Sequence, residues 1–293
     1  MRRASLLPLL SVLGSVTFLA LGTSWAKHTL FPLVGAQGTT AVRVGFSALL
    51  LLILWRPWRW PLKGRDARMV AYYGAALGAM NLCFYMALRT IPFGVAVAIE
   101  FSGPLLVALL GSRRPMDFIW VVFAIVGLLL LLPLVNNVST LDPTGVMYAL
   151  VAAALWATYI ISGKRVEHMH AGHSVSLGLT VAAVVVVPIG AIQAGSALLS
   201  PTVILVGLGV AALSSAIPMS LEMVALKRLP KQAFGIMLSM EPAAAALLAL
   251  LLLDEHLSAT QWVAIALIMA ASMGSAITAQ RPTITPVTAS LPG

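Results

Sequence analysis

The chain has 293 residues, of which 60% are hydrophobic and only 9% are charged. Soluble domains carry about 25% charged residues, so this composition excludes an ordinary soluble enzyme, a disordered chain and a nucleic-acid binder. The formal net charge is +9, and the single cysteine, Cys83, excludes a disulfide framework and a cysteine-rich metal site.

Ten apolar segments follow one another along the chain, each close to the 20 or so residues that a membrane-spanning helix needs. They cover residues 4–26, 36–55, 69–88, 91–112, 118–135, 144–163, 174–194, 203–226, 233–253 and 260–279. The first segment is too long for the apolar part of a cleaved signal peptide. Residues 243–253 are apolar on every side, which favours helices over the alternating strands of a membrane barrel. We therefore predict an all-α membrane protein with ten transmembrane helices.

The basic residues predict the orientation of the helices, because Lys and Arg favour cytoplasmic loops. With a cytoplasmic N-terminus, fifteen of the 18 basic residues fall on the cytoplasmic side. The opposite side then holds Lys27 and Arg89, and Arg43 lies within a segment. Both termini are therefore expected in the cytoplasm, and the Pro/Thr/Ser-rich residues 281–293 are expected to form a flexible cytoplasmic tail.

The chain also shows weak similarity to itself. At an offset of 138 residues Pro92 aligns with Pro230 and Pro104 with Pro242, and at an offset of 131 Trp25 aligns with Trp156. Five helices per unit make the second unit inverted relative to the first. We predict two inverted five-helix repeats, residues 1–140 and 141–280, with a site near the midplane between them. The alternative is a chance alignment of biased sequence.

Four ionisable residues lie inside the apolar segments: Arg43, Glu100, Glu222 and Glu241. Each costs about 2.5–3.5 kcal/mol at a helix centre on insertion scales, and such residues normally face a bundle interior or a water-filled cavity. They are therefore candidate functional residues.

Glu100 is the first candidate. Pro104 has no N–H, so the carbonyl group of Glu100 loses its helical partner. A carboxylate, this carbonyl and the Ser102 hydroxyl would together suit an ammonium group or a proton. The alternative is a glutamate that is held in a structural ion pair or kept protonated.

Glu241 directly precedes Pro242, which aligns with Pro104, so the repeat would bring the two carboxylates to facing walls of one cavity. Arg43 either neutralises one of these glutamates or binds a substrate carboxylate. Glu241 could have a functional or a structural role, and both roles stay open for Arg43.

Glu222 lies near the cytoplasmic end of its segment, five residues before Lys227, which favours a structural or gating role. Pro218 is expected to free the carbonyl group of Ser214 in the same way.

Three aromatic residues could form a cavity wall: Trp25, Trp156 and Tyr159. Gly74 and Gly78 have a spacing that permits close helix packing, within one chain or in a dimer. Three histidines in residues 167–173 could bind a metal but are better explained as a solvated loop. No nucleotide-binding or zinc-protease motif is present, and we expect no cofactor and no metal.

Several stretches make the chain resemble the EamA-type transporters of the drug/metabolite transporter superfamily, and within them the inner-membrane exporters of threonine and homoserine. These stretches are Phe31-Pro32-Leu33-Val34-Gly35-Ala36, Glu100-Phe101 with Gly103-Pro104-Leu105, Ser112-Arg113-Arg114-Pro115, Val187-Pro188-Ile189-Gly190, Gln193-Ala194-Gly195, Ser239-Met240-Glu241-Pro242-Ala243 and Ala270-Ala271-Ser272-Met273-Gly274-Ser275. The resemblance implies proton-coupled export of L-threonine and L-homoserine across a bacterial inner membrane. It assigns no role to a single residue.

The sequence therefore predicts a secondary exporter of small amino acids that is not an enzyme. Its expected partners are the amino acid, protons and the lipid bilayer, without nucleic acid, and it would act as a monomer or homodimer. Three alternatives remain. A multidrug or lipophilic-cation exporter would need a wide aromatic cavity, and a channel or sensor would need a polar stripe. An intramembrane enzyme would need a base beside Ser214 or Ser215, and no histidine lies at that depth.

Overall fold

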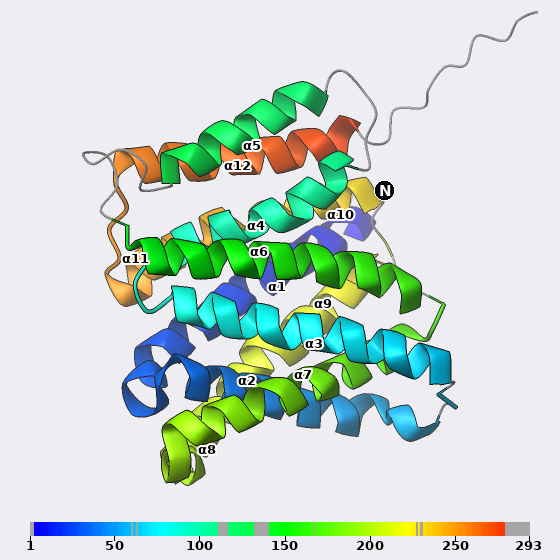
Figure 1. Ribbon diagram of the computed structural model, residues 1–293. Helices are drawn as coiled ribbons and strands as arrows, with labels where there is room; N and C mark the ends of the chain where they lie inside the picture. Colours follow the sequence, from blue (N-terminus) through cyan, green and yellow to red (C-terminus); the bar gives the residue numbers. More distant parts are fainter. Residues whose placement is uncertain are drawn as a thin grey trace, which may run out of the picture.

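The computed structural model describes residues 3–59, 61–62, 64–110, 117–131, 141–166, 168–226, 228 and 231–278. These residues form helices joined by short connections and contain no strand. Figure 1 shows the helices running side by side between two ends of the molecule. The N-terminus and the α2–α3 and α6–α7 connections lie at one end, and the α1–α2, α3–α4 and α11–α12 connections lie at the other.

Eight helices have 15 residues or more: α1 (Arg3–Thr29), α2 (Phe31–Trp55), α3 (Gly64–Ala87), α4 (Phe93–Leu110), α5 (Asp117–Leu131), α6 (Pro143–Gly163), α7 (Ala171–Ala194) and α12 (Ala259–Thr278). The other helices are shorter: α8 (Pro201–Ala211), α9 (Ile217–Leu226), α10 (Lys231–Leu238) and α11 (Glu241–Leu253). A π-helical turn, η4 (Ala212–Ala216), joins α8 to α9, and short 3-10 turns occupy η1 (Pro57–Arg59), η2 (Lys164–Val166) and η3 (Gly195–Leu199).

The lengths of these helices agree with the ten predicted spans. Within the described residues, eight helical stretches are long and apolar enough to cross a membrane. Two shorter apolar helices, Phe93–Val107 and Phe118–Leu131, correspond to the fourth and fifth predicted segments. The protein is therefore an all-α membrane protein.

Helix α4 lies at the centre of the bundle. Its residues Val95, Ala96, Ala98 and Ile99 are fully buried, as expected for a helix that is apolar on all sides and packed against other helices. Around it, α2 packs along α7, α3 along α6 and α5 along α12. Gly74 brings α3 against α7, because an added Cβ would lie 2.5 Å from the carbonyl oxygen of Gly178. The glycine spacing thus serves packing within the chain.

Two of the predicted segments, the eighth and the ninth, are interrupted, and one irregularity lies just before the second segment. There Gly35 has φ +66° and ψ −177°, which interrupts α2 near its start. The eighth span contains the π-helical turn η4, which lies just before Pro218. The ninth span is divided between Leu238 and Glu241, with Pro242 in the first turn of α11, where its missing N–H costs nothing. Hydropathy alone cannot reveal these breaks, because the interrupted residues stay apolar.

Candidate functional site

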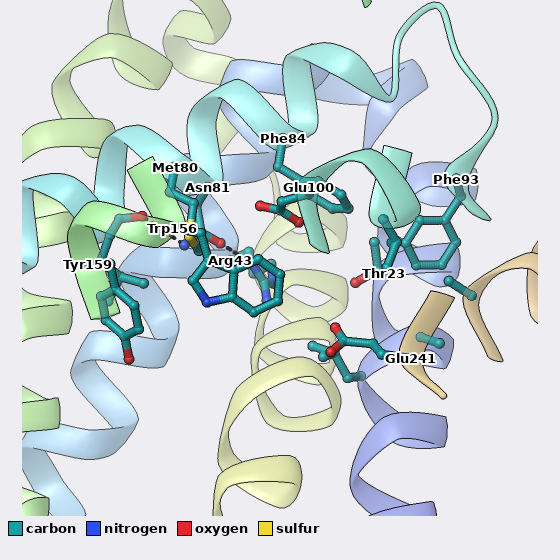
Figure 2. Close-up of a pocket in the computed structure, with 15 residues that line it drawn as sticks. Thr23, Arg43, Met80, Asn81, Phe84, Phe93, Glu100, Trp156, Tyr159 and Glu241 are labelled. Carbon is teal, nitrogen blue, oxygen red and sulfur yellow. Dashed lines mark hydrogen bonds between the residues drawn. The ribbon is translucent and has the colours of Figure 1, made fainter. Parts of the chain in front are cut away.

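Two of the candidate glutamates and the candidate arginine line one cavity. The central cavity has a volume of about 210 Å³ and is lined by Leu19, Ala20, Thr23, Arg43, Leu77, Met80, Asn81, Phe84, Phe93, Val97, Glu100, Trp156, Tyr159, Glu241 and Ala245. In Figure 2, Glu100 and Glu241 extend from different helices toward the same space as Arg43. Tyr159 and Phe93 lie on opposite sides of this space.

Glu100 and Glu241 reach the cavity from different kinds of position. Glu100 lies in the middle of the central helix α4 and is 7% exposed. Glu241 is the first residue of α11, so the break in the ninth span places a helix N-terminus and a carboxylate at the cavity. Within the described chain, neither carboxylate has a hydrogen-bond or ion-pair partner. A carboxylate without a partner in a low-dielectric setting is costly, so both groups require a cation or a proton from the cavity.

Arg43 is held in place by neutral groups. Its Nε donates to Ser214 Oγ at 2.8 Å, its Nη1 donates to Asn81 Oδ1, and its Nη2 lies 3.5 Å from the carbonyl oxygen of Ser214. Pro218 supplies no N–H to this carbonyl, so the carbonyl remains available to the guanidinium. The guanidinium carbon also lies 5.5 Å from the centre of the Tyr85 ring, a cation–π arrangement.

No ion pair joins Arg43 to a glutamate among the described residues, and the side chains that hydrogen-bond to its guanidinium there are neutral. A guanidinium has five N–H donors. The hydrogen bonds above engage three of them, so two donors remain for a ligand. The expected alternative of a direct buried Arg–Glu pair is therefore absent from this conformation.

A second cavity of about 230 Å³ shares a wall with the central cavity. It is lined by Leu19, Arg43, Val44, Ser47, Tyr73, Leu77, Met80, Asn81, Tyr159, Val175, Leu179, Ser214, Ser215, Pro218, Met219 and Glu222. Six residues line both cavities, among them Arg43, Asn81 and Tyr159. Glu222 is thus a cavity-lining residue, and Ser15 Oγ donates to its Oε1 at 2.7 Å. Lys227, its expected neighbour, lies outside the described residues.

Aromatic side chains separate the second cavity from an open pocket at the end of the molecule that carries Lys164. Tyr73 and Tyr159 line both spaces. Their rings are stacked with centroids 4.8 Å apart, and the Tyr73 hydroxyl donates to that of Tyr159 at 3.2 Å.

An ion pair lies at the opposite end of the molecule. Lys27, at the end of α1, approaches Glu255 Oε1 at 2.6 Å, and the backbone N–H of Phe93 donates to Glu255 Oε2 at 2.6 Å. Phe93 begins α4 and lines the central cavity. One carboxylate in the α11–α12 connection therefore ties together α1 and the N-terminus of α4, where a negative charge is favourable.

Some expected site residues lie elsewhere. The Ser102 hydroxyl donates to the carbonyl of Ile99 at 2.6 Å, a bond within its own helix, and Ser102 lines neither cavity. Trp25 packs against Gly209 and also lies outside both cavities, whereas Trp156 and Tyr159 line the central one. Asn81 lines both cavities but was not among the predicted site residues, although a polar amide within an apolar segment was a signal for it.

Pro104 and Pro242 have different effects on their helices. Helix α4 continues through Pro104, so this proline does not interrupt the fourth span. Pro242 instead occupies the first turn of α11, directly after the break.

Comparisons with known proteins identify the family. The EamA-like transporter family matches residues 143–277. The chain is 48% identical over 275 residues to the protein named threonine/homoserine exporter RhtA of Salmonella typhimurium (strain SL1344), and equally to that of Escherichia coli (strain K12). These alignments cover 94% of this chain and 93% of each relative. The chain belongs to the EamA-like transporter family.

The fold has a counterpart among solved structures. One crystal structure aligns with a TM-score of 0.55 at 19% sequence identity, covering 95% of this chain and 99% of that chain. This likeness supports the fold described above.

Proposed function

We propose that the protein is a secondary exporter of L-threonine and L-homoserine that exchanges them for protons. The single observation that carries this proposal is the central cavity, in which unpartnered Glu100 and Glu241 face an arginine with free N–H donors. Such a site matches an α-amino acid, which carries one ammonium and one carboxylate group. The relatives named threonine/homoserine exporter RhtA support this choice of substrate.

Arg43 binds the substrate carboxylate through its two remaining N–H donors, and Glu100 or Glu241 binds the ammonium group. The volume of about 210 Å³ is below the roughly 300–1,000 Å³ of pockets for drug-sized ligands, which supports a small substrate over a multidrug cargo. Proton antiport follows from competition. A proton and an ammonium group cannot both occupy one carboxylate, so binding of one releases the other.

The proposed topology places the N-terminus, the C-terminus and the end that carries Lys164 in the cytoplasm of a bacterial inner membrane. Two inverted repeats, residues 1–140 and 141–280, are part of the proposal. Symmetry-related contacts support them: α3 packs on α6 as α1 packs on α9, and α4 packs on α6 as α1 packs on α11. The family match at residues 143–277 also covers most of the second repeat.

Transport into inside-out vesicles tests the function. Vesicles with an acidic lumen should accumulate labelled threonine against its gradient, and Glu100→Gln should abolish accumulation because the neutral amide neither carries a proton nor pairs with an ammonium group. Ser102→Ala is the matched control, since Ser102 lies in the same helix and bonds only its own backbone. Full activity of Glu100→Gln would exclude this carboxylate from the mechanism. Uptake of cationic dyes in place of threonine would favour a multidrug exporter.

A further inference from the structure

The second cavity has the chemical features of a binding site in its own right. It is about as large as the central cavity, at about 230 Å³, and it lies on the side of the open pocket that carries Lys164. Its charged groups are Arg43 and Glu222, and the hydroxyls of Ser47, Ser214 and Ser215 also line it. A cavity with one cation, one carboxylate and several hydroxyls matches the charges of a zwitterion.

Glu222 can accept another donor. Ser15 Oγ is its only hydrogen-bond partner within the described chain, and it occupies Oε1. No described lysine, arginine or histidine forms an ion pair with Glu222. A carboxylate within a membrane span that holds a single neutral hydrogen bond is poorly compensated, so an ammonium group in the cavity would stabilise it.

Arg43 connects the two cavities. It lies on their shared wall, and Ser214 and Asn81, which hold its guanidinium, also line the second cavity. The two remaining N–H donors suffice for one carboxylate but not for two. The two sites therefore cannot both hold an amino acid through Arg43 at the same time.

We infer that the second cavity is a cytoplasmic loading site for the substrate zwitterion, with Glu222 as its ammonium ligand and Arg43 as its carboxylate ligand. The substrate then moves from the second cavity to the central cavity by rotating about its carboxylate, which stays bound to Arg43. During this rotation its ammonium group leaves Glu222 and reaches the carboxylates of the central cavity. This inference rests on the proposed function and adds a second binding station and a specific role for Glu222.

Substrate protection of an introduced cysteine tests the loading site. In a Cys83→Ala background, Met219→Cys places a thiol in the second cavity and not in the central one. Val175→Cys, on the facing helix α7, provides an independent reporter if the first variant folds poorly. The measurement is the rate of modification by a thiol reagent added to inside-out vesicles, with and without threonine.

Threonine should slow modification, and it should still do so when Glu100→Gln is added, because the loading site keeps its own carboxylate. Glu222→Gln should raise the threonine concentration for half-maximal protection by about tenfold or more, the effect of losing a charge-assisted hydrogen bond. Asp66→Asn is the matched control, since it removes a carboxylate outside both cavities.

The outcomes separate the inference from the proposed function. An unchanged threonine concentration for half-maximal protection in Glu222→Gln, or protection that is lost with Glu100→Gln alone, would overturn the loading site while wild-type transport of threonine continued. Wild-type protein that neither transports threonine nor is protected by it would overturn the proposed function itself.

Discussion

Arg43 lines both cavities, and its fixed geometry is central to the proposed site. Its guanidinium is fixed by Ser214 from the π-helical turn η4 and by Asn81 from α3. The Asn81 amide is itself oriented, because its Nδ2 donates to the Leu77 carbonyl at 2.9 Å. A planar group held on two edges presents its remaining donors in one direction, which a flexible ammonium cannot do.

We therefore expect Arg43→Lys to bind threonine more weakly although it keeps the positive charge. The apparent KM for threonine in counterflow should rise by about tenfold or more, since two parallel hydrogen bonds become one point-charge contact. Arg89→Lys is the control, because Arg89 lies in the α3–α4 connection and lines neither cavity. An unchanged KM for Arg43→Lys would show that the substrate carboxylate binds elsewhere.

At the scale of single residues, the sequence predicted which charged residues line the cavity better than it predicted where other side chains point. A charge inside an apolar segment identified Arg43, Glu100 and Glu241, because a charged side chain is costly in the membrane and normally faces the bundle interior or a cavity. The same reasoning failed for Ser102 and Trp25. Helices that are apolar on nearly every side carry no periodicity that tells which face meets the cavity, so only packing decides it.

At the scale of elements, the two ends of the bundle are closed by different chemistry. Tyr73 and Tyr159 stack at the end proposed to be cytoplasmic. Glu255 joins Lys27 and the N-terminus of α4 at the other end, and the side chains of this pair are only 18% and 16% exposed. Because α1 and α4 both line the central cavity, we expect this contact to restrict access to the cavity from that side.

Lys27→Gln should therefore expose the central cavity to the periplasm. With Thr23→Cys as the reporter in a Cys83→Ala background, labelling by an impermeant reagent from that side should quicken about tenfold, equivalent to roughly 1.4 kcal/mol. Lys27→Arg, which keeps the positive charge beside Glu255, should keep labelling slow, and Arg89→Gln, at the same end, should have no effect. Equal labelling rates in all variants would refute the closure.

The interruption of α2 is also testable. Gly35 has φ +66°, and an added Cβ would lie 2.9 Å from the Gln193 side-chain nitrogen. Gly35→Ala should destabilise the protein by about 1–3 kcal/mol from backbone strain alone, visible as a lower melting temperature in detergent. Gly64→Ala is the matched control, because no atom lies within 4 Å of its added Cβ. Equal melting temperatures for both variants would contradict the strain.

At the scale of the whole molecule, hydropathy predicted the ten spans because each must hide its backbone from lipid. The breaks in the eighth and ninth spans could not be located in this way. Proline indicated where they occur, but whether a proline interrupts a helix or begins one depends on its neighbours. Pro104 lies inside continuous α4, whereas Pro242 occupies the first turn of α11.

The distribution of basic residues predicts the position of the whole bundle in the membrane. A reporter fused after Gly293 should be active only as a cytoplasmic fusion, because fifteen basic residues fall on that side in the proposed orientation. Alkaline phosphatase and a fluorescent protein give opposite signals for the two locations. A periplasmic signal would require either an odd number of spans or a periplasmic N-terminus, and would overturn the proposed topology.

The carboxylate of Glu255 has a consequence for which end of the carrier opens more readily. Opening the end that carries Glu255 breaks two charge-assisted contacts, whereas opening the other end separates two stacked rings and one hydroxyl contact. In the proposed orientation, this imbalance would favour an empty carrier that is open to the cytoplasm. Its export rate would then follow the internal concentration of amino acid, while the gradients of proton and amino acid set the direction of transport.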